Sequence, residues 1–255
     1  MLLALVMAFW ALPVRTLTPH ECFVSVTSRE MIASNDWVWP TFNSQPRLQK
    51  TPLMYWLVAG TGKLAGHVNE FVARFPSALA AVLSCAAMIF FLRKWLSLRT
   101  ALICASIWTT TLAYARCSHN ARPEMLMTFF VVVCFLSFYA GFTAEKRSEQ
   151  IRYMLIFWVS LGLGNIAKGP APLALVGVPL FVYVAVYRKW RTIPKLLPIV
   201  GPLIAFAIML PWPLAIAYKL NWDLTLWKHE FFDRFFGDYA KGNYPLYYYA
   251  GIIWK

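Results

Sequence analysis

A series of long apolar runs dominates this sequence and constrains its fold more than any other feature. The runs cover residues 1–14, 71–92, 101–115, 125–144, 153–167, 171–187 and 196–218, and a last run covers 244–254. A helix needs roughly 20 apolar residues to cross a bilayer. Charged residues make up 14% of the chain, whereas soluble domains typically carry about 25%. We therefore predict an all-α fold, a polytopic transmembrane helix bundle with about seven or eight spans, and exclude a soluble domain.

The two ends of the sequence bear on its domain organisation. The first run is interpreted as a shortened span and not as a signal peptide, because Pro13-Val14-Arg15 lacks the small residues of a cleavage site. The last run is cut off by the end of the sequence at Lys255. We expect residues 1–255 to form a single transmembrane domain whose C-terminal part is missing.

The longest connection between apolar runs, residues 16–70, is rich in proline and in charged residues. Two of its segments, 20–34 and 51–64, have the apolar spacing of amphipathic helices. Such helices lie along a membrane surface. We predict that this connection is an outer catalytic loop with two interfacial helices.

Basic residues in three short connections indicate the orientation of the spans. Lysines and arginines accumulate in cytoplasmic loops of membrane proteins. The connections contain Arg93, Lys94 and Arg99; Lys146, Arg147 and Arg152; and Arg188, Lys189, Arg191 and Lys195. These loops are predicted to be cytoplasmic, so that residues 16–70, 116–124, the turn at Lys168 and residues 219–243 face outward.

The net charge of +13 is explained by these loops, and it does not indicate a nucleic-acid partner. The basic residues are scattered and form no stripe with interleaved aromatic residues. The chain has five cysteines, none of them in a cluster with metal-ligand spacing. Cys22 and Cys117 fall on the same predicted side, and two free thiols are preferred over a disulfide.

Ionisable residues lie at or near the predicted membrane boundary in every outer connection, where charge is costly unless it is used. The candidates are His20, Glu21, Lys50, Arg116, His119, Arg122, Glu124 and Lys168. Both acids and bases are present, so the outer ends of the spans are predicted to converge on one polar cavity.

The order of short motifs along the chain resembles a known family. The motifs are Pro19-His20-Glu21, Trp37-Val38-Trp39-Pro40, Asn43, the segment from Lys50 to Trp56, the segment from Asn69 to Ala78, Ala121-Arg122-Pro123-Glu124-Met125, Ala167-Lys168-Gly169-Pro170 and Leu210-Pro211-Trp212. They resemble the polyprenyl-phosphate-sugar-dependent glycosyltransferases of the GT-C fold, which include protein mannosyltransferases and lipid A aminoarabinose transferases. The resemblance covers nearly the whole chain.

The resemblance implies transfer of a sugar from a polyprenyl-phosphate donor to an acceptor at the outer side of a membrane, in bacteria the periplasmic side of the inner membrane. Glu21 and His20 are then the candidate catalytic residues that take the acceptor proton. Lys50, Lys168 and Arg122 are the candidates for binding the donor phosphate. The other polar candidates are Glu124, Arg116 and His119. No cofactor and no metal ligand are assigned, and the need for a divalent metal is left open.

The chain departs from the family pattern at three positions. His20 stands where the family usually has an aspartate that is the presumed base, so either His20 or Glu21 could take the proton. Gln49 precedes Lys50 where related transferases often have an acid, which weakens a metal site. Glu124 replaces a frequent aspartate and keeps the charge.

Two other classes of function fit the same residues. A secondary transporter would use the charges as substrate sites, although the chain lacks the paired interrupted half-helices that transporters often show. A non-catalytic, lipid-binding relative fits the His20 substitution. Each candidate also has a structural interpretation: Glu21 as an acid at a helix start, the lysines as interfacial anchors, and Arg122 and Glu124 as a local ion pair. The acceptor, a lipid, a glycan or a protein hydroxyl, is left open.

Overall fold

The computed structural model describes residues 1–223 and 225. The chain divides into two compact units, Met1–Pro213 and Leu214–Lys255. The predicted last run at 244–254 and most of the predicted outer connection at 219–243 lie outside the described residues. The prediction of one domain over residues 1–255 stays a prediction.

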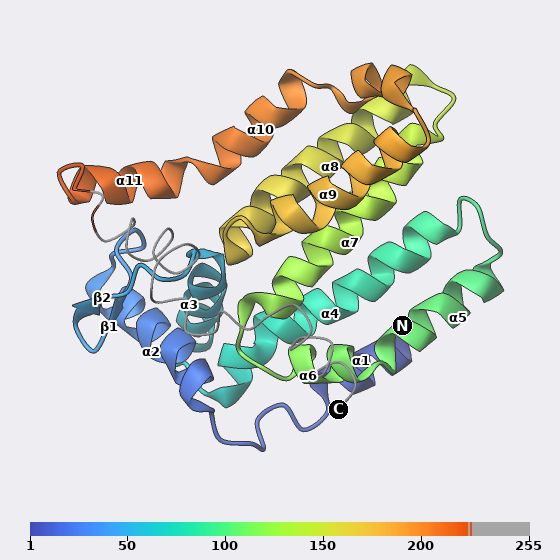
Figure 1. Ribbon diagram of the computed structural model, residues 1–255. Coiled ribbons are helices and arrows are strands. Elements are labelled where there is room, and N and C mark those ends of the chain that lie inside the picture. Colours follow the sequence, from blue (N-terminus) through green and yellow to red (C-terminus); the bar gives the residue numbers. More distant parts are fainter. Residues whose placement is uncertain (224, 226–255) are drawn as a thin grey trace, which may run out of the picture. The chain divides into compact units, whose positions relative to one another are not determined.

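Nearly all regular structure is helical, which confirms the predicted all-α class (Figure 1). The α-helices are α1 (Leu2–Phe9), α2 (Pro19–Ser34), α3 (Leu53–Ala65), α4 (Glu70–Leu92), α5 (Leu98–Thr109), α6 (Leu112–Ser118), α7 (Pro123–Phe142), α8 (Arg147–Lys168), α9 (Ala171–Val186), α10 (Val200–Met209) and α11 (Pro211–Lys219). A 3-10 helix, η1, covers Trp190–Leu196. The two-residue strands β1 (Thr41–Phe42) and β2 (Gln45–Pro46) pair antiparallel.

Each predicted span in the described part of the chain contains helix, but the helices differ in length. Within the described part of the chain, α4 and α7 are long and apolar enough to cross a membrane, and there are up to three such spans if the helical segments Ile193–Met209 and Pro211–Lys219 form one bent span. The count of long apolar helices is therefore lower than the number of apolar runs. Pro211 interrupts the run at 196–218 because proline has no backbone N–H to donate to the preceding turn.

The predicted span at 101–115 is divided into α5 and α6, and three consecutive threonines explain the break. The hydroxyls of Thr109 and Thr110 donate to the carbonyl of Ser106 at 2.8 and 3.1 Å. The Thr111 hydroxyl donates to the Trp108 carbonyl and accepts from the Tyr114 amide at the start of α6. Threonine hydroxyls thus end one helix and cap the next, as side chains that compete with the backbone do.

The two amphipathic segments predicted in the 16–70 connection are confirmed as helices α2 and α3. They pack on each other, and α3 packs on α4. Two indoles fix the loop after α2: Trp56 Nε1 donates to the Trp37 carbonyl at 2.6 Å and Trp212 Nε1 donates to the Val38 carbonyl at 2.9 Å. This loop, the strands and the two helices form a cap at one end of α4 (Figure 1).

Apolar clusters hold the helices of the first unit together. One cluster joins α1, α4, α6 and the start of α7, and a second joins α2, α3 and the first turns of α4. In the third, α7, α8 and α9 lie side by side and share Phe138, Phe157 and Val176 (Figure 1). The first two clusters meet along the N-terminal part of α4. The polar candidates lie at this N-terminal end of the helix.

Candidate active site

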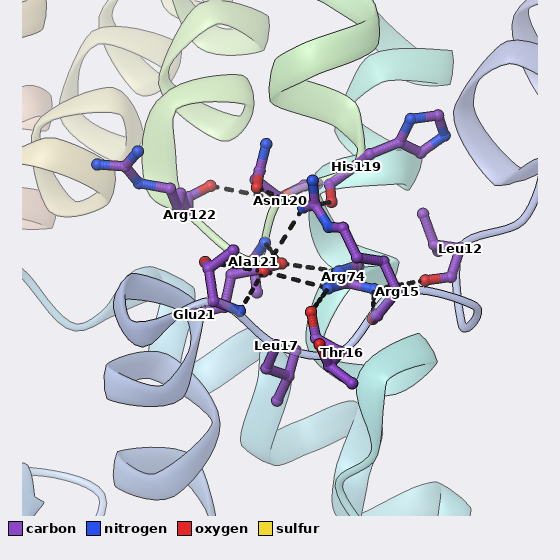
Figure 2. Close-up of polar contacts among 12 residues, drawn as sticks. Leu12, Arg15, Thr16, Leu17, Glu21, Arg74, His119, Asn120, Ala121 and Arg122 are labelled. Atoms are coloured by element: carbon purple, nitrogen blue, oxygen red, sulfur yellow. Dashed lines mark hydrogen bonds and ion pairs between the residues drawn. The ribbon is translucent and has the colours of Figure 1, made fainter.

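A buried ion pair between Glu21 and Arg74 lies at the centre of the polar end of the first unit (Figure 2). Arg74 Nε donates to Glu21 Oε1 at 2.7 Å and Arg74 Nη2 donates to Oε2 at 3.1 Å. Glu21 is fully buried and Arg74 is 1% exposed. Two parallel bonds between a guanidinium and a carboxylate fix both distance and orientation.

Other hydrogen bonds connect this pair to three segments of the chain. Arg74 Nη1 donates to the carbonyls of Leu12 and Arg15, both at 2.7 Å, and Nη2 donates to the Thr16 carbonyl at 3.1 Å. Glu21 accepts from the amide of Thr18, which belongs to the capping box of α2, and also from the Thr18 hydroxyl. Its Oε1 accepts from the amide of residue 121 at 3.0 Å. We call Glu21, Arg74 and these hydrogen-bond partners the buried hub; it joins the α1–α2 turn, α4 and the loop before α7 (Figure 2).

The hydrogen bonds of the buried hub set the acidity of Glu21. Burial alone would raise its pKa, but the bonds from Arg74, Thr18 and Ala121 together outweigh burial and lower the pKa to about 2. A carboxylate that holds its charge so firmly, with both oxygens already accepting hydrogen bonds, is a weak proton acceptor. The arrangement favours a positioning role for Glu21.

A second group of charges lies where α7 begins and α8 ends. Lys168 Nζ donates to Glu124 Oε1 at 3.1 Å, and Arg122 Nε lies 3.7 Å from Glu124 Oε2. The side chains of Lys168 and Glu124 are 30% and 28% exposed. Glu124 Oε2 has no hydrogen-bond partner within the part of the chain that the structure describes. We call Arg122, Glu124 and Lys168 the lysine cluster; it carries a net positive charge and open hydrogen-bonding capacity.

The segment that contains Lys50 leads into α3 near the lysine cluster. Leu53 packs against the apolar cluster that includes Met125 and Ala167, each next to a member of the lysine cluster. Lys50 is exposed. The buried oxygens Gln49 Oε1 and Thr51 Oγ1 have no hydrogen-bond partner among the described residues. Such atoms are costly unless a ligand or water completes them.

The remaining predicted residues differ in their exposure. His20 follows Pro19 at the start of α2, is exposed, and its ring centroid lies 6.2 Å from that of Phe23. His119 is half-buried, and burial together with Arg15 and Arg74 lowers its pKa. Its Nε2 has no hydrogen-bond partner within the described chain. Arg116 is exposed at the end of α6.

Arg74 is the charged residue of the buried hub that the sequence did not single out as a candidate. It lies four residues into the apolar run at 71–92. An ionisable residue inside a predicted span is a candidate for function by position alone, and that signal could have found it. Its partner Glu21 lies 53 residues away in the sequence.

Among the described residues no group of three or more histidine, cysteine, aspartate or glutamate side chains is arranged to hold a metal ion. Cys22 and Cys117 are free thiols, as are the other three cysteines.

The chain is similar to known proteins in sequence. A family model described as dolichyl-phosphate-mannose-protein mannosyltransferase matches residues 49–214. The undecaprenyl phosphate-alpha-4-amino-4-deoxy-L-arabinose arabinosyl transferase of Edwardsiella ictaluri (strain 93-146) is 30% identical over 238 residues, covering 92% of this chain and 43% of that protein. The enzyme of the same name from Aeromonas salmonicida (strain A449) is 31% identical, with 91% and 42% covered. This chain spans less than half the length of these relatives.

The fold has a solved counterpart. The crystal structure of ArnT from Cupriavidus metallidurans bound to undecaprenyl phosphate matches with a TM-score of 0.80 and 24% identity, over 90% of this chain and 43% of that one. The structure of the same protein in the apo state matches with a TM-score of 0.82 and 23% identity, over 93% and 47%. This likeness confirms the predicted membrane helix bundle of GT-C type.

Proposed function

The chain belongs to the dolichyl-phosphate-mannose-protein mannosyltransferase family, and from this premise we propose that it is part of an integral membrane glycosyltransferase. It moves a sugar from a polyprenyl-phosphate-linked donor to an acceptor on the outer side of the membrane. The names of the similar arabinosyl transferases support a donor of this class. So does the undecaprenyl phosphate bound to ArnT, the protein with the similar fold.

The lysine cluster is the observation that carries the proposal. When a sugar leaves polyprenyl phosphate, negative charge gathers on the phosphate, and fixed cations stabilise that charge in the transition state. Lys168 and Arg122 are cations at adjacent helix ends, and Glu124 holds the Lys168 ammonium at 3.1 Å. The exposed Lys50 supplies a third cation from the neighbouring segment. These residues bind the donor phosphate.

The acceptor hydroxyl must lose a proton as it attacks the sugar. His20 is the proposed general base, because it is exposed beside the hub and imidazoles accept protons near neutral pH. Glu21 fixes the start of α2, and with it the position of His20, through the buried hub. Gln49 Oε1 and Thr51 Oγ1, buried without hydrogen-bond partners in the described chain, accept hydrogen bonds from sugar hydroxyls.

The orientation and location follow from the loop charges. With the basic connections in the cytoplasm, the buried hub and the lysine cluster face the periplasm of a bacterial inner membrane. The acceptor is a hydroxyl group presented there by a lipid, a glycan or a protein.

A transfer assay tests the proposal. Membranes that contain the protein are supplied with a panel of radiolabelled polyprenyl-phosphate pentoses and hexoses, and wild type is compared with His20→Ala, Lys50→Ala and Lys168→Ala at equal amounts of folded protein. Arg99→Ala, an exposed arginine on α5, is the matched control. We expect each site variant to lose about tenfold or more in rate and the control to lose nothing.

The outcomes separate the rival functions. Transfer that none of the site substitutions changes would contradict the assigned residues. No transfer from any donor, together with solute counterflow in proteoliposomes, would identify a transporter. Donor binding without transfer, equally tight in wild type and in His20→Ala, would identify a non-catalytic lipid-binding relative.

A further inference from the structure

An open surface pocket of about 470 Å³, called the cavity below, lies at the opposite end of the α2–α3 pair from the hub. Its lining includes Arg29, Lys63 and His67, with Ile32, Ala33 and Val68 as apolar walls. Arg29 is eight residues beyond Glu21 along α2, a distance of about 12 Å at the rise of an α-helix. The cavity is therefore separate from the buried hub.

Two of the side chains that line the cavity have hydrogen-bond partners, Arg29 in a backbone carbonyl and His67 in the side chain of Asn69. Arg29 donates from Nε and Nη2 to the Val68 carbonyl, at 3.1 and 2.5 Å. Asn69 Oδ1 accepts from the Val72 amide as the cap of α4, which turns Nδ2 toward His67 Nε2 at 3.0 Å. An amide nitrogen only donates, so Nε2 of His67 accepts this hydrogen bond.

The charge of the cavity favours an anion. Arg29 and Lys63 are cations, and none of the described residues that line the cavity is acidic. The C-terminal end of α3 contributes a partial negative charge of about half a unit, which two full positive charges outweigh. Apart from these two cations and His67 the lining is apolar or glycine, so a ligand that has an anionic group attached to a hydrocarbon part fits it better than a free ion does.

The position of the cavity brings it to a membrane surface whichever side it faces. Val68 lies two residues before α4, a helix long and apolar enough to span a bilayer. Leu64, next to Lys63, is 90% exposed. Exposed leucine and lysine side by side shortly before a span are typical of an interfacial segment whose basic residue contacts lipid phosphate.

We propose that the cavity between the C-terminal halves of α2 and α3 binds the phosphate headgroup of an anionic lipid, with Arg29 and Lys63 on the phosphate and Ile32 and Ala33 against the acyl chain. The lipid anchors the outer cap to the membrane surface at a site apart from the donor. The site does not depend on sugar transfer.

Native mass spectrometry of the full chain in detergent tests this site. Phosphatidylglycerol and phosphatidylcholine with the same acyl chains are offered together, and the ratio of the two bound lipids is measured. We expect wild type to prefer phosphatidylglycerol about tenfold, and Lys63→Glu to lose that preference. Ala33→Trp fills the cavity without changing its charge, and this variant should also lose the preference for phosphatidylglycerol. Lys146→Glu reverses the charge of an exposed lysine away from the cavity, and this variant should keep the preference.

The remaining experiments distinguish a lipid phosphate from inorganic phosphate as the ligand. Inorganic phosphate should not displace phosphatidylglycerol at equal concentration, because it cannot use the apolar wall; displacement would overturn the lipid assignment. Equal binding of the two lipids by wild type, or unchanged preference in both cavity variants, would overturn the site. Thermal midpoints confirm that the variants are folded, and Lys63→Gln replaces Lys63→Glu if the latter is not. Because the readout is binding alone, failure here leaves the proposed transferase activity standing.

Discussion

The buried hub and the lysine cluster contain the same kinds of charged group, but these groups differ in burial and in how many of their hydrogen bonds are made. In the hub, every oxygen of Glu21 accepts hydrogen bonds and Arg74 has five contacts with carboxylate and backbone oxygens. In the lysine cluster, the charges are partly exposed and Glu124 Oε2 has no hydrogen-bond partner among the described residues. Buried charged groups that have made all their hydrogen bonds fix a structure. Charged groups at a surface that have hydrogen-bonding capacity left are available to a ligand. The two regions should therefore respond differently to mutation.

The largest effect is expected from Arg74→Ala. It leaves the buried Glu21 carboxylate without its partner and three backbone carbonyls without donors, a type of change that costs about 3–5 kcal/mol. The lost stability is measured by thermal unfolding of the purified protein, and size-exclusion chromatography is then run on the same protein. Arg74→Lys should restore part of it, since lysine keeps the charge but lacks the planar fork.

Arg99→Ala on the surface of α5 is the control and should change little. If Arg74→Ala were as mild as Arg99→Ala, the hub would not be the structural centre of this end of the molecule.

The next largest effect is a pH dependence carried by Glu21. Its pKa is about 2 in the folded protein against an ordinary 4.5, so its stabilisation is present above pH 4.5 and is lost as the pH falls toward 2. The difference corresponds to roughly 3 kcal/mol. Unfolding midpoints of wild type and Glu21→Gln, measured from pH 7 to pH 2.5, should differ most at pH 7 and converge in acid. A constant difference across that range would mean that the carboxylate is not ionised in the hub.

A smaller effect is expected from Thr18→Ala, which removes one capping bond of α2 and one donor to Glu21. Loss of an N-cap side chain costs about 1 kcal/mol. Ser97→Ala removes the equivalent cap of α5 and is the matched comparison. In a double-mutant cycle, Thr18→Ala should cost less when Glu21 is already glutamine, whereas Ser97→Ala should cost the same in both backgrounds. Equal costs for Thr18→Ala in both backgrounds would separate the cap from the hub.

The sequence predicted the elements of this fold better than their interruptions. Apolar spacing located α2 and α3, and long continuous apolar runs located α4 and α7, because each pattern reports burial along one segment. It did not predict the break between α5 and α6, since Thr109, Thr110 and Thr111 are compatible with an apolar helix until their hydroxyls compete for its carbonyls.

The residues of the site divide in the same way, into those that the local sequence predicted and those that it did not. The residues of the lysine cluster were predicted because they lie next to the ends of apolar runs. The Glu21–Arg74 pair was not predicted, because the two residues are far apart in sequence and no local pattern reports which acid meets which base. The roles of Glu21, His20 and the lysines stay predictions.

The lysine cluster gives the smallest expected change in stability and the most direct test of the account. Lys168→Ala breaks a partly exposed ion pair, which is worth up to about 1 kcal/mol, so the unfolding midpoint should barely move. The rate of sugar transfer from radiolabelled polyprenyl-phosphate donor, measured in a single turnover on folded protein, should fall about tenfold or more. Lys168→Ala that unfolds near the wild-type midpoint and transfers sugar at the wild-type rate would contradict the claim that this cluster binds the donor phosphate.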